Sequence, residues 1–280
     1  MERRVQVEGF FHGPSNTISY LLWDPATLRG ALIDPVLDFD AASGKADTRS
    51  VDAVLGRAAE IGLEVEWSLE THVHADHLSG AQRVRDQTGA RTVIGAGVKD
   101  VQRTFAPMFG IDMAGDGGEF DLLVEDGDRL PLGEIEIRAI AVPGHTPADV
   151  AYLVGDVVFV GDSLFMPDYG TARCDFPGGS ARQLHASVQR LLALPDETRM
   201  FVCHDYKAPG REDFAWETTV GAQRANVHLQ GGTADAFVAM REARDATLSV
   251  PAMLLPALQV NICGGRVPGA LKIPVTWATN

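Results

Sequence analysis

The chain is poor in basic residues, with 24 Lys and Arg against 38 Asp and Glu, which gives a formal net charge of −14. Nucleic-acid binding depends on Lys and Arg contacts to phosphate, so this composition argues against a nucleic acid as partner. An anionic substrate would need a local basic patch to offset the negative field of the whole molecule. These numbers favour a soluble protein that acts on something other than a polyanion.

Cysteine is also scarce, because Cys174, Cys203 and Cys263 are the only three and form no C-x-x-C pair. An odd number without paired spacing fits a reducing cytosol better than a disulfide framework, and the simplest interpretation is three buried thiols. No apolar run approaches the roughly 20 residues that a membrane span requires. The start MERRVQVEGFFHGPSN lacks the apolar core of a secretory signal. We therefore expect a cytoplasmic protein with no membrane partner.

Repeats, low-complexity blocks and clear linkers are absent from the 280 residues. A chain of this length has room for one large domain or two small ones. We expect a single domain over residues 1–280. Its C-terminal part, from about residue 212 to residue 280, is expected to pack on the rest as helices and irregular chain.

Strand and helix patterns alternate along the chain, which indicates a layered α/β architecture. Short apolar runs predict a hairpin over Val150–Val160 around Gly155-Asp156 and the strands Thr17–Trp23, Gly30–Ile33, Val65–Glu70, Arg91–Ile94, Glu134–Val142 and Met200–Cys203. Helical spacing predicts helices over Val51–Ile61, Leu78–Thr88, Ser180–Leu194, Trp216–Leu229 and Ala234–Leu248. Val101–Phe120 is rich in Gly and is expected to form a long loop or lid, and the remainder after Leu248 is expected to be irregular.

Four side chains able to bind a metal lie within the segment Thr71-His72-Val73-His74-Ala75-Asp76-His77. In an extended segment residues i and i+2 point to the same side, so His72 and His74 can present imidazole nitrogens to one ion. Where the chain turns toward the next helix, Asp76 and His77 swing to the adjacent side of the same pocket. The spacing H-x-H-x-D-H therefore predicts one loop that supplies ligands to one or two metal ions.

Three more candidate ligands each follow the end of a predicted strand. His145 follows AIAVPG, Asp162 follows VVFVG and His204 follows MFVC. Ends of adjacent strands meet at one rim of a sheet, where α/β proteins commonly place their sites. Five of the eight histidines thus fall where they can converge, and the others are interpreted as ordinary core or surface residues, namely His12, His185 and His228.

Other catalytic patterns are absent. A Ser-His-Asp set would need a G-x-S-x-G elbow, and the sequence has none. The H-E-x-x-H zinc motif and the Walker phosphate loop are missing as well. The metal-ligand pattern is therefore the feature on which a functional hypothesis rests.

The order H-x-H-x-D-H, Gly-His, strand-end Asp and strand-end His resembles the signature of the metallo-β-lactamase superfamily. The resemblance covers about the first three quarters of the chain and implies an αββα sandwich, in which two mixed sheets carry helices on their outer faces and a metal at their edge. Within the superfamily, the stretches THVHADHLSG, VPGHTP, VFVGDSLF, GTARCDF and HDY resemble the persulfide dioxygenases, also called sulfur dioxygenases. That family is related to the glyoxalase II thioester hydrolases, and the long C-terminal region looks more like its bacterial branch.

By this resemblance, one Fe(II) per chain would be bound by His72, His145 and Asp162. Two imidazoles and one carboxylate on one face match the facial triad of non-haem iron oxygenases, which leaves positions open for substrate and dioxygen. The other candidates would stand behind these ligands and orient them, namely His74, Asp76, His77 and His204. A binuclear zinc hydrolase would use the same residues as ligands, so the ligand set alone leaves both cases open.

The resemblance also implies a reaction of glutathione persulfide, or another low-molecular-weight persulfide, with O2 and water to give sulfite and thiol. Arg173, Asp175 and Tyr206 match family positions that line the substrate channel, and Arg173 and Tyr206 are the candidate catalytic groups. Arg173 would pair with a glutathione carboxylate, and Tyr206 would donate a hydrogen bond to substrate or bound oxygen. The alternative for Arg173 and Asp175 is an ordinary surface ion pair.

Two other functions stay open. A zinc-dependent, glyoxalase II-type thioester hydrolase is motivated by the retention of all seven potential ligands. A non-catalytic sulfur or metal sensor is disfavoured, because the charge is acidic and nothing resembles a DNA-reading module. Family members often dimerise, so the resemblance allows a homodimer, with the apolar segment Val250–Val260 as a candidate contact.

Overall fold

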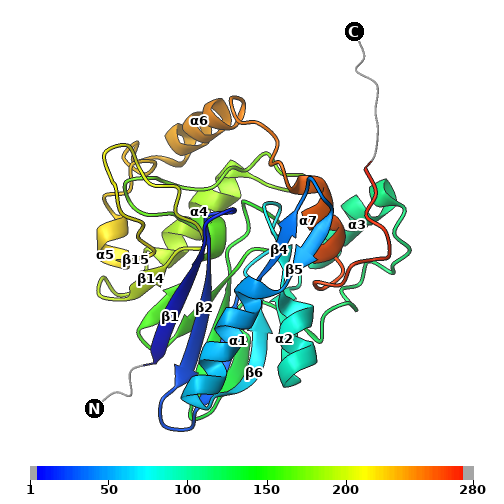
Figure 1. Cartoon of the computed structure of the whole chain (residues 1–280). Helices are drawn as coiled ribbons and strands as arrows, with labels where there is room; N and C mark the ends of the chain where they lie inside the picture. The colour runs from blue at the N-terminus through cyan, green and yellow to red at the C-terminus, as the bar shows by residue number, and fades with distance from the viewer. Residues whose placement is uncertain (1–4, 274–280) are drawn as a thin grey trace.

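Two six-stranded β-sheets form the centre of the molecule (Figure 1), and the computed structural model describes residues 5–273. The first sheet has the spatial order β1 (Gln6–His12), β2 (Thr17–Asp24), β3 (Arg29–Ile33), β6 (Glu64–Leu69), β8 (Arg91–Gly95) and β9 (Leu122–Val124). The second has the order β10 (Arg129–Leu132), β11 (Ile135–Ala141), β12 (Val150–Val154), β13 (Val157–Phe159), β14 (Arg199–Phe201) and β15 (Glu217–Thr219). A small third sheet has the order β5 (Lys45–Asp47), β4 (Val36–Asp40) and β7 (Leu78–Ser79).

Helices cover the outer faces of both large sheets. The helices of residues 5–273 are α1 (Arg49–Ile61), α2 (Ala81–Thr88), α3 (Val98–Phe109), η1 (Gly161–Ser163), α4 (Ala181–Leu191), α5 (Val220–Gln223), α6 (Ala234–Asp245) and α7 (Leu254–Asn261), and several of them cover the sheets. The helices α1 and α2 pack on the first sheet, α4 packs on the second, and α6 lies over α4 (Figure 1). Helix α3 packs against α7 beside the first sheet. The order helix, sheet, sheet, helix confirms the expected αββα sandwich.

Strand direction brings the polar strand ends to one edge. In the first sheet β3, β6, β8 and β9 are parallel, and β1 and β2 are antiparallel to their neighbours. In the second sheet β10 to β13 form an antiparallel meander, and the crossover through α4 makes β14 parallel to β13. The strands β11, β13 and β14 therefore point the same way, so the residues that follow them meet at one edge.

The main core lies between the two sheets and follows the period-two alternation of strands. In β2, Ile18, Tyr20 and Leu22 enter this core, whereas Leu21 points to the other face and packs against α1. Tyr152 of β12 is fully buried and its hydroxyl donates a hydrogen bond to the carbonyl of Glu70, which ties the second sheet to the loop after β6.

Most predicted elements are confirmed. The strands expected near residues 17–23, 30–33, 65–70, 91–94, 134–142 and 200–203 are all present, as is the hairpin around Gly155-Asp156. The helices expected over Val51–Ile61, Ser180–Leu194 and Ala234–Leu248 correspond to α1, α4 and α6. The helix expected from Leu78 starts only at Ala81, because Leu78 and Ser79 pair with β4.

Val101–Phe120 was expected to be a loop, and this expectation is wrong for its first half, which belongs to α3. Val98, Val101, Phe105 and Phe109 recur at helical spacing and are buried. Their packing outweighs the cost of Pro107 in the last turn. The glycine-rich half, after Gly110, does lack helix and strand until β9.

Two C-terminal expectations also need correction. Trp216–Leu229 is not one helix, because residues 217–219 pair with β14 as β15 and only α5 follows. Sheet pairing overrides the local helical pattern there. The remainder after Leu248 was expected to be irregular, yet it contains α7, in which Pro256 occupies the first turn, where a missing N–H costs little. The expected C-terminal part extends over residues 274–280, which lie outside the described residues.

Among residues 5–273, no helix combines the length and hydropathy that a bilayer crossing requires.

Candidate metal centre

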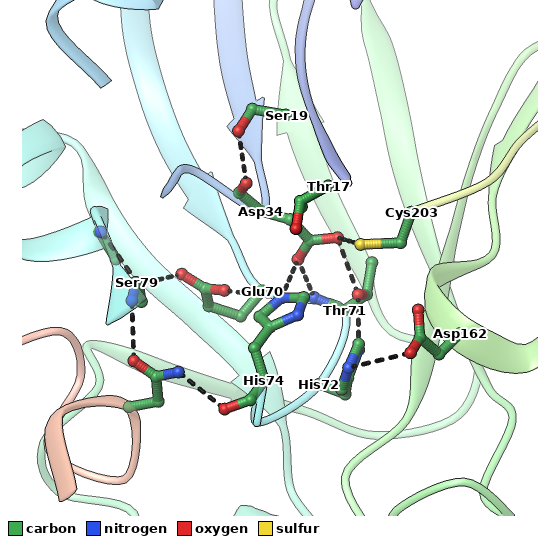
Figure 2. Close-up of polar contacts among 12 residues, drawn as sticks. Thr17, Ser19, Asp34, Glu70, Thr71, His72, His74, Ser79, Asp162 and Cys203 are labelled. Atoms are coloured by element: carbon green, nitrogen blue, oxygen red, sulfur yellow. Dashed lines mark hydrogen bonds and ion pairs between the residues drawn. The ribbon is translucent and has the colours of Figure 1, made fainter. Parts of the chain in front are cut away.

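The predicted ligands lie together at the edge of the sandwich where strands of both sheets end. Figure 2 shows three of them, His72, His74 and Asp162. Residues 70–77 form the loop after β6, His145 follows β11, Asp162 lies in η1 after β13, and His204 follows β14. A single β-bridge between Thr17 and His204 joins the two sheets at this edge. The site is therefore built on the ends of rigid strands rather than on one flexible loop.

His72, His145 and Asp162 form one group, whose ligand atoms all lie within 4.8 Å of one another. Oδ2 of Asp162 lies 3.9 Å from Nε2 of His72 and 3.6 Å from Nε2 of His145. His145 and Asp162 also line a cavity, so this group has one open side. Two imidazoles and one carboxylate in this arrangement can hold a divalent cation and leave positions free for other molecules.

Hydrogen bonds leave the Nε2 atoms of both histidines free to bind a metal. Nδ1 of His145 donates to the carbonyl of Arg173 at 2.7 Å. Nδ1 of His72 lies 3.0 Å from Oγ1 of Thr71, which itself donates to Asp34 and therefore accepts from the ring. Burial, reinforced by the neighbouring His74, lowers the pKa of His72 well below its usual value. The ring is thus neutral, which is the form that ligates metals.

A second group consists of His74, Asp76 and His77, with His204 beside it. Oδ2 of Asp76 lies 3.2 Å from Nδ1 of His77 and 3.6 Å from Nε2 of His204. Burial would raise the pKa of Asp76, but His204 and His77 outweigh burial and hold it well below its usual value. Burial lowers the pKa of His77 to about 4. Asp76 therefore presents a carboxylate and His77 a neutral imidazole, whereas the carboxylates of Asp34 and Glu70 outweigh burial and raise the pKa of His74 well above its usual value.

The unpaired atoms of the site show that it fits a cation. Seven buried side-chain N or O atoms lack a hydrogen-bond partner in the described part of the chain. Four of these belong to the two ligand groups, namely Nδ1 of His74, Nε2 of His77, Oδ1 of Asp162 and Nε2 of His204. Buried polar atoms without partners are costly and rare, so their concentration here needs a charged occupant. A divalent metal with N and O preference satisfies them, and both iron and zinc accept this donor set.

Asp34 is a functional residue that the sequence analysis missed. It follows β3, is buried, and accepts hydrogen bonds from the backbone N–H and hydroxyl of Thr71 at 2.7 and 2.8 Å and from Nε2 of His74 at 3.0 Å. Figure 2 shows these bonds converging on its carboxylate. Burial acts to raise the pKa of Asp34, but the contacts from His74 and Thr71 lower it. The signal available was its position, since it ends a strand at the same edge as the other ligands.

A cavity of about 210 Å³ opens beside the first ligand group. Phe165, Tyr169 and Tyr206 form an aromatic wall, with the Tyr206 ring stacked on His204 at 5.6 Å. Burial, and then the carboxylate of Asp162, raise the pKa of Tyr206, so its hydroxyl keeps its proton and can act as a donor. The cavity is thus a mixed apolar and polar chamber that leads to Asp162.

Arg173 lines this cavity, but its guanidinium is already engaged. Its Nε and Nη2 lie 2.5 and 2.6 Å from the carboxylate of Asp175, and Nη1 donates to the carbonyl of Ser249 at 2.7 Å. Asp175 is not among the residues that line the chamber. Arg244 lines the same chamber, and its guanidinium has no hydrogen-bond or ion-pair partner among residues 5–273. Arg173 and Asp175 thus form the ion pair that was the alternative interpretation.

The three histidines set aside earlier belong to neither ligand group. His12 bonds to Ser15 and His185 packs against Phe237. Nδ1 of His228 accepts a hydrogen bond from the backbone of Thr171.

The chain matches known proteins over most of its length. The family model of the metallo-beta-lactamase superfamily matches residues 12–204, which include every predicted ligand. A probable metallo-hydrolase of Burkholderia pseudomallei is 50% identical, covering 97% of this chain and 99% of its own. A beta-lactamase hydrolase-like protein of Agrobacterium fabrum is 52% identical over 94% of this chain, which spans only 61% of that longer relative.

Persulfide dioxygenases are also among the similar proteins. Persulfide dioxygenase ETHE1 of Homo sapiens is 32% identical, over 72% of this chain and 69% of its own. The crystal structure of ETHE1 from Myxococcus xanthus aligns with a TM-score of 0.74 and 31% identity, over 93% of this chain and all of that one. By the family model and these relatives, the chain belongs to the metallo-β-lactamase superfamily.

Proposed function

We propose that the protein is an Fe(II)-dependent persulfide dioxygenase that converts glutathione persulfide, O2 and water into sulfite and glutathione. The observation that carries the proposal is the group of His72, His145 and Asp162, which can hold one cation and opens onto the cavity. The likeness to ETHE1 proteins supports it, in sequence and in fold.

His72, His145 and Asp162 would hold the metal through two Nε2 atoms and a carboxylate oxygen. Bound there, iron(II) supplies the redox chemistry between the persulfide sulfur and dioxygen. The chain contributes orientation, because the bonds from His145 to Arg173 and from His72 to Thr71 fix each ring with Nε2 toward the metal. The aromatic wall gives the cavity an apolar side, and the protonated Tyr206 hydroxyl donates a hydrogen bond toward the reacting sulfur or oxygen.

Binding of the glutathione part requires cations in an otherwise acidic molecule. Arg244 offers a guanidinium without a partner among the described residues, whereas Arg173 shares its charge with Asp175. We infer that Arg244 supplies the main contact to a glutathione carboxylate, and that Arg173 chiefly fixes His145 and the cavity wall.

A second function is favoured by one specific observation. The group of His74, Asp76 and His77 lies beside the first, and His204 reaches both Asp76 and Asp162. Two zinc ions in these groups would make a thioester hydrolase of the glyoxalase II type, with a metal-activated water as nucleophile. Relatives named as hydrolases are consistent with this alternative.

The deciding experiment uses anaerobically purified protein whose iron content has been measured. Oxygen uptake with glutathione persulfide, together with an equal amount of sulfite, is expected at about one iron per chain. Absence of uptake by the iron-loaded protein would contradict the proposal. Hydrolysis of S-lactoylglutathione by protein carrying two zinc ions would then establish the alternative.

A further inference from the structure

Asn261, at the end of α7, makes three side-chain hydrogen bonds to the loop that carries the H-x-H-x-D-H motif. Its Nδ2 donates to the carbonyl of His74 and to the carbonyl of His77, both at 2.8 Å. Its Oδ1 accepts from the backbone N–H of Ser79 at 2.7 Å. Two carbonyl acceptors and one N–H donor fix the orientation of the amide, with its nitrogen toward the carbonyls and its oxygen toward Ser79. Both amide protons are used in these bonds. Asn261 is 4% exposed, so water does not replace these bonds.

These bonds hold a loop that lacks regular secondary structure. Residues 71–77 belong to no helix or strand, so their backbone groups gain no ladder partners. A planar amide that binds the carbonyls of His74 and His77 together fixes the separation of these two residues. That separation determines whether their free nitrogens, Nδ1 and Nε2 respectively, can face one cation.

A second connection runs through Ser79 to the His74 ring itself. The hydroxyl of Ser79 donates to Oε1 of Glu70 at 2.5 Å, and Oε2 of Glu70 lies 3.3 Å from Nε2 of His74 (Figure 2). Oε2 of Glu70 and Oδ1 of Asp34 thus face the same ring nitrogen, which leaves Nδ1 of His74 without a protein partner and available to a metal. Asn261 therefore contacts His74 in two ways. It binds the carbonyl of His74 directly, and it holds Ser79, which positions Glu70 beside the His74 ring.

Helix α7 is firmly anchored. Leu258 and Ile262 pack into one cluster with Val101 and Phe105 of α3. The side chain of Gln102 donates to the carbonyl of Ile262 at 2.9 Å. Asn261 is therefore held by a rigid pair of helices, and it lies outside residues 12–204, which the superfamily model matches.

We propose that Asn261 is a positioning residue of the metal centre, which sets the geometry of His74 and His77 through the loop backbone. This inference goes beyond the proposed function and holds whether the resident metal is iron or zinc. Asn261→Asp is the sharpest variant, because it keeps the size and the acceptor for Ser79 but turns an oxygen toward two carbonyl oxygens.

The matched control is Gln259→Ala on the same helix. Gln259 is also buried, but its amide bonds to the carbonyls of Leu255 and Lys272 and to the N–H of Lys272, not to the motif loop. Both variants remove buried amide hydrogen bonds, so both are expected to lower the thermal stability of the metal-free protein. Only the Asn261 variant is expected to change the metal site.

The test is Zn(II) affinity, measured by competition with a chelator on folded protein, with hydrogen exchange of residues 74–79 measured alongside. Asn261→Asp is expected to weaken Zn(II) binding about 10- to 100-fold, which is the usual effect of replacing a residue that orients metal ligands. It is also expected to speed hydrogen exchange at the backbone N–H of Ser79. Gln259→Ala is expected to keep the wild-type affinity. If the aspartate protein does not fold, Asn261→Ala replaces it. Equal Zn(II) affinity of the Asn261 variant and the Gln259 variant overturns the proposal.

Discussion

Nε2 of His204 lies 3.4 Å from Oδ1 of Asp162, while Oδ2 of the same carboxylate faces His145. Asp162 therefore stands between the two ligand groups and would be shared if two cations were bound. This position makes it the residue whose replacement affects either kind of metal centre most.

Replacement of ligands should distinguish one metal from two. Asp162→Ala and His145→Ala are each expected to abolish metal binding, because each removes one of three protein ligands of the first group. His77→Ala is expected to keep one metal per chain with about 10- to 100-fold weaker affinity. Metal content by atomic emission, with chelator competition, gives the answer. Equal loss in all three variants would mean that both groups hold metal.

Asp34→Ala should destabilise the metal-free protein strongly. The substitution leaves the ring N–H of His74 and both donors of Thr71 without this acceptor in a buried site. Removing one partner of a buried ion pair lowers the free energy of unfolding by about 3–5 kcal/mol. Urea unfolding measures this loss. Asp112→Ala at an exposed position serves as the control and should change the free energy of unfolding by less than about 0.5 kcal/mol.

His228 should make stability depend on pH. Burial, and then Arg241 and Arg244, lower the pKa of His228 from 6.5 to about 4 in the folded protein. The fold prefers the neutral ring, so its contribution is complete above pH 6.5 and is lost as the pH falls toward about 4. Unfolding titrations of wild type and His228→Gln should therefore diverge over this range, with the steeper loss in wild type. Parallel curves would contradict this prediction.

Arg244→Gln should weaken the binding of glutathione persulfide. Loss of a charge-assisted hydrogen bond to a carboxylate is expected to raise KM about tenfold or more and to change kcat less. Steady-state oxygen uptake measures both constants. Arg182→Gln, on the exposed face of α4, is the control because Arg182 pairs with Asp235 outside the chamber. An unchanged KM in the Arg244 variant would remove this residue from the binding site.

The three cysteines should be inert in the folded protein. Burial raises the pKa of Cys174 to about 12 and that of Cys263 to about 11, and it holds the pKa of Cys203 well above its usual value. Only the thiolate is a nucleophile. Iodoacetamide at about pH 8 should therefore label none of the three until denaturant is added, as mass spectrometry would show. Fast labelling of native Cys174 would refute the buried-thiol interpretation.

Local patterns in the sequence predicted the parts of the site that lie on strand ends. His145, Asp162 and His204 each follow a clear apolar run, and parallel direction alone brings such residues to one edge. Asp34 follows the same rule, and its role was missed because an Asp before Pro35 is typical of turns.

The C-terminal contribution could not be predicted from local pattern. Pro256 in α7 suppresses the helical signal, and Asn261 carries no motif of its own. Its function depends on α7 packing against α3, which is a tertiary contact between segments far apart in sequence. Arg173 was likewise judged from its residue type, whereas its bonds to Asp175 and Ser249 depend on the fold.

The dependence of the motif loop on Asn261 has a consequence for biosynthesis. His74 and His77 leave the ribosome long before α7 is made, so the nascent chain carries the histidines without the amide that fixes their spacing. The nascent loop therefore lacks one of the contacts that order it, and His74 and His77 reach their final spacing only after α7 has packed against α3.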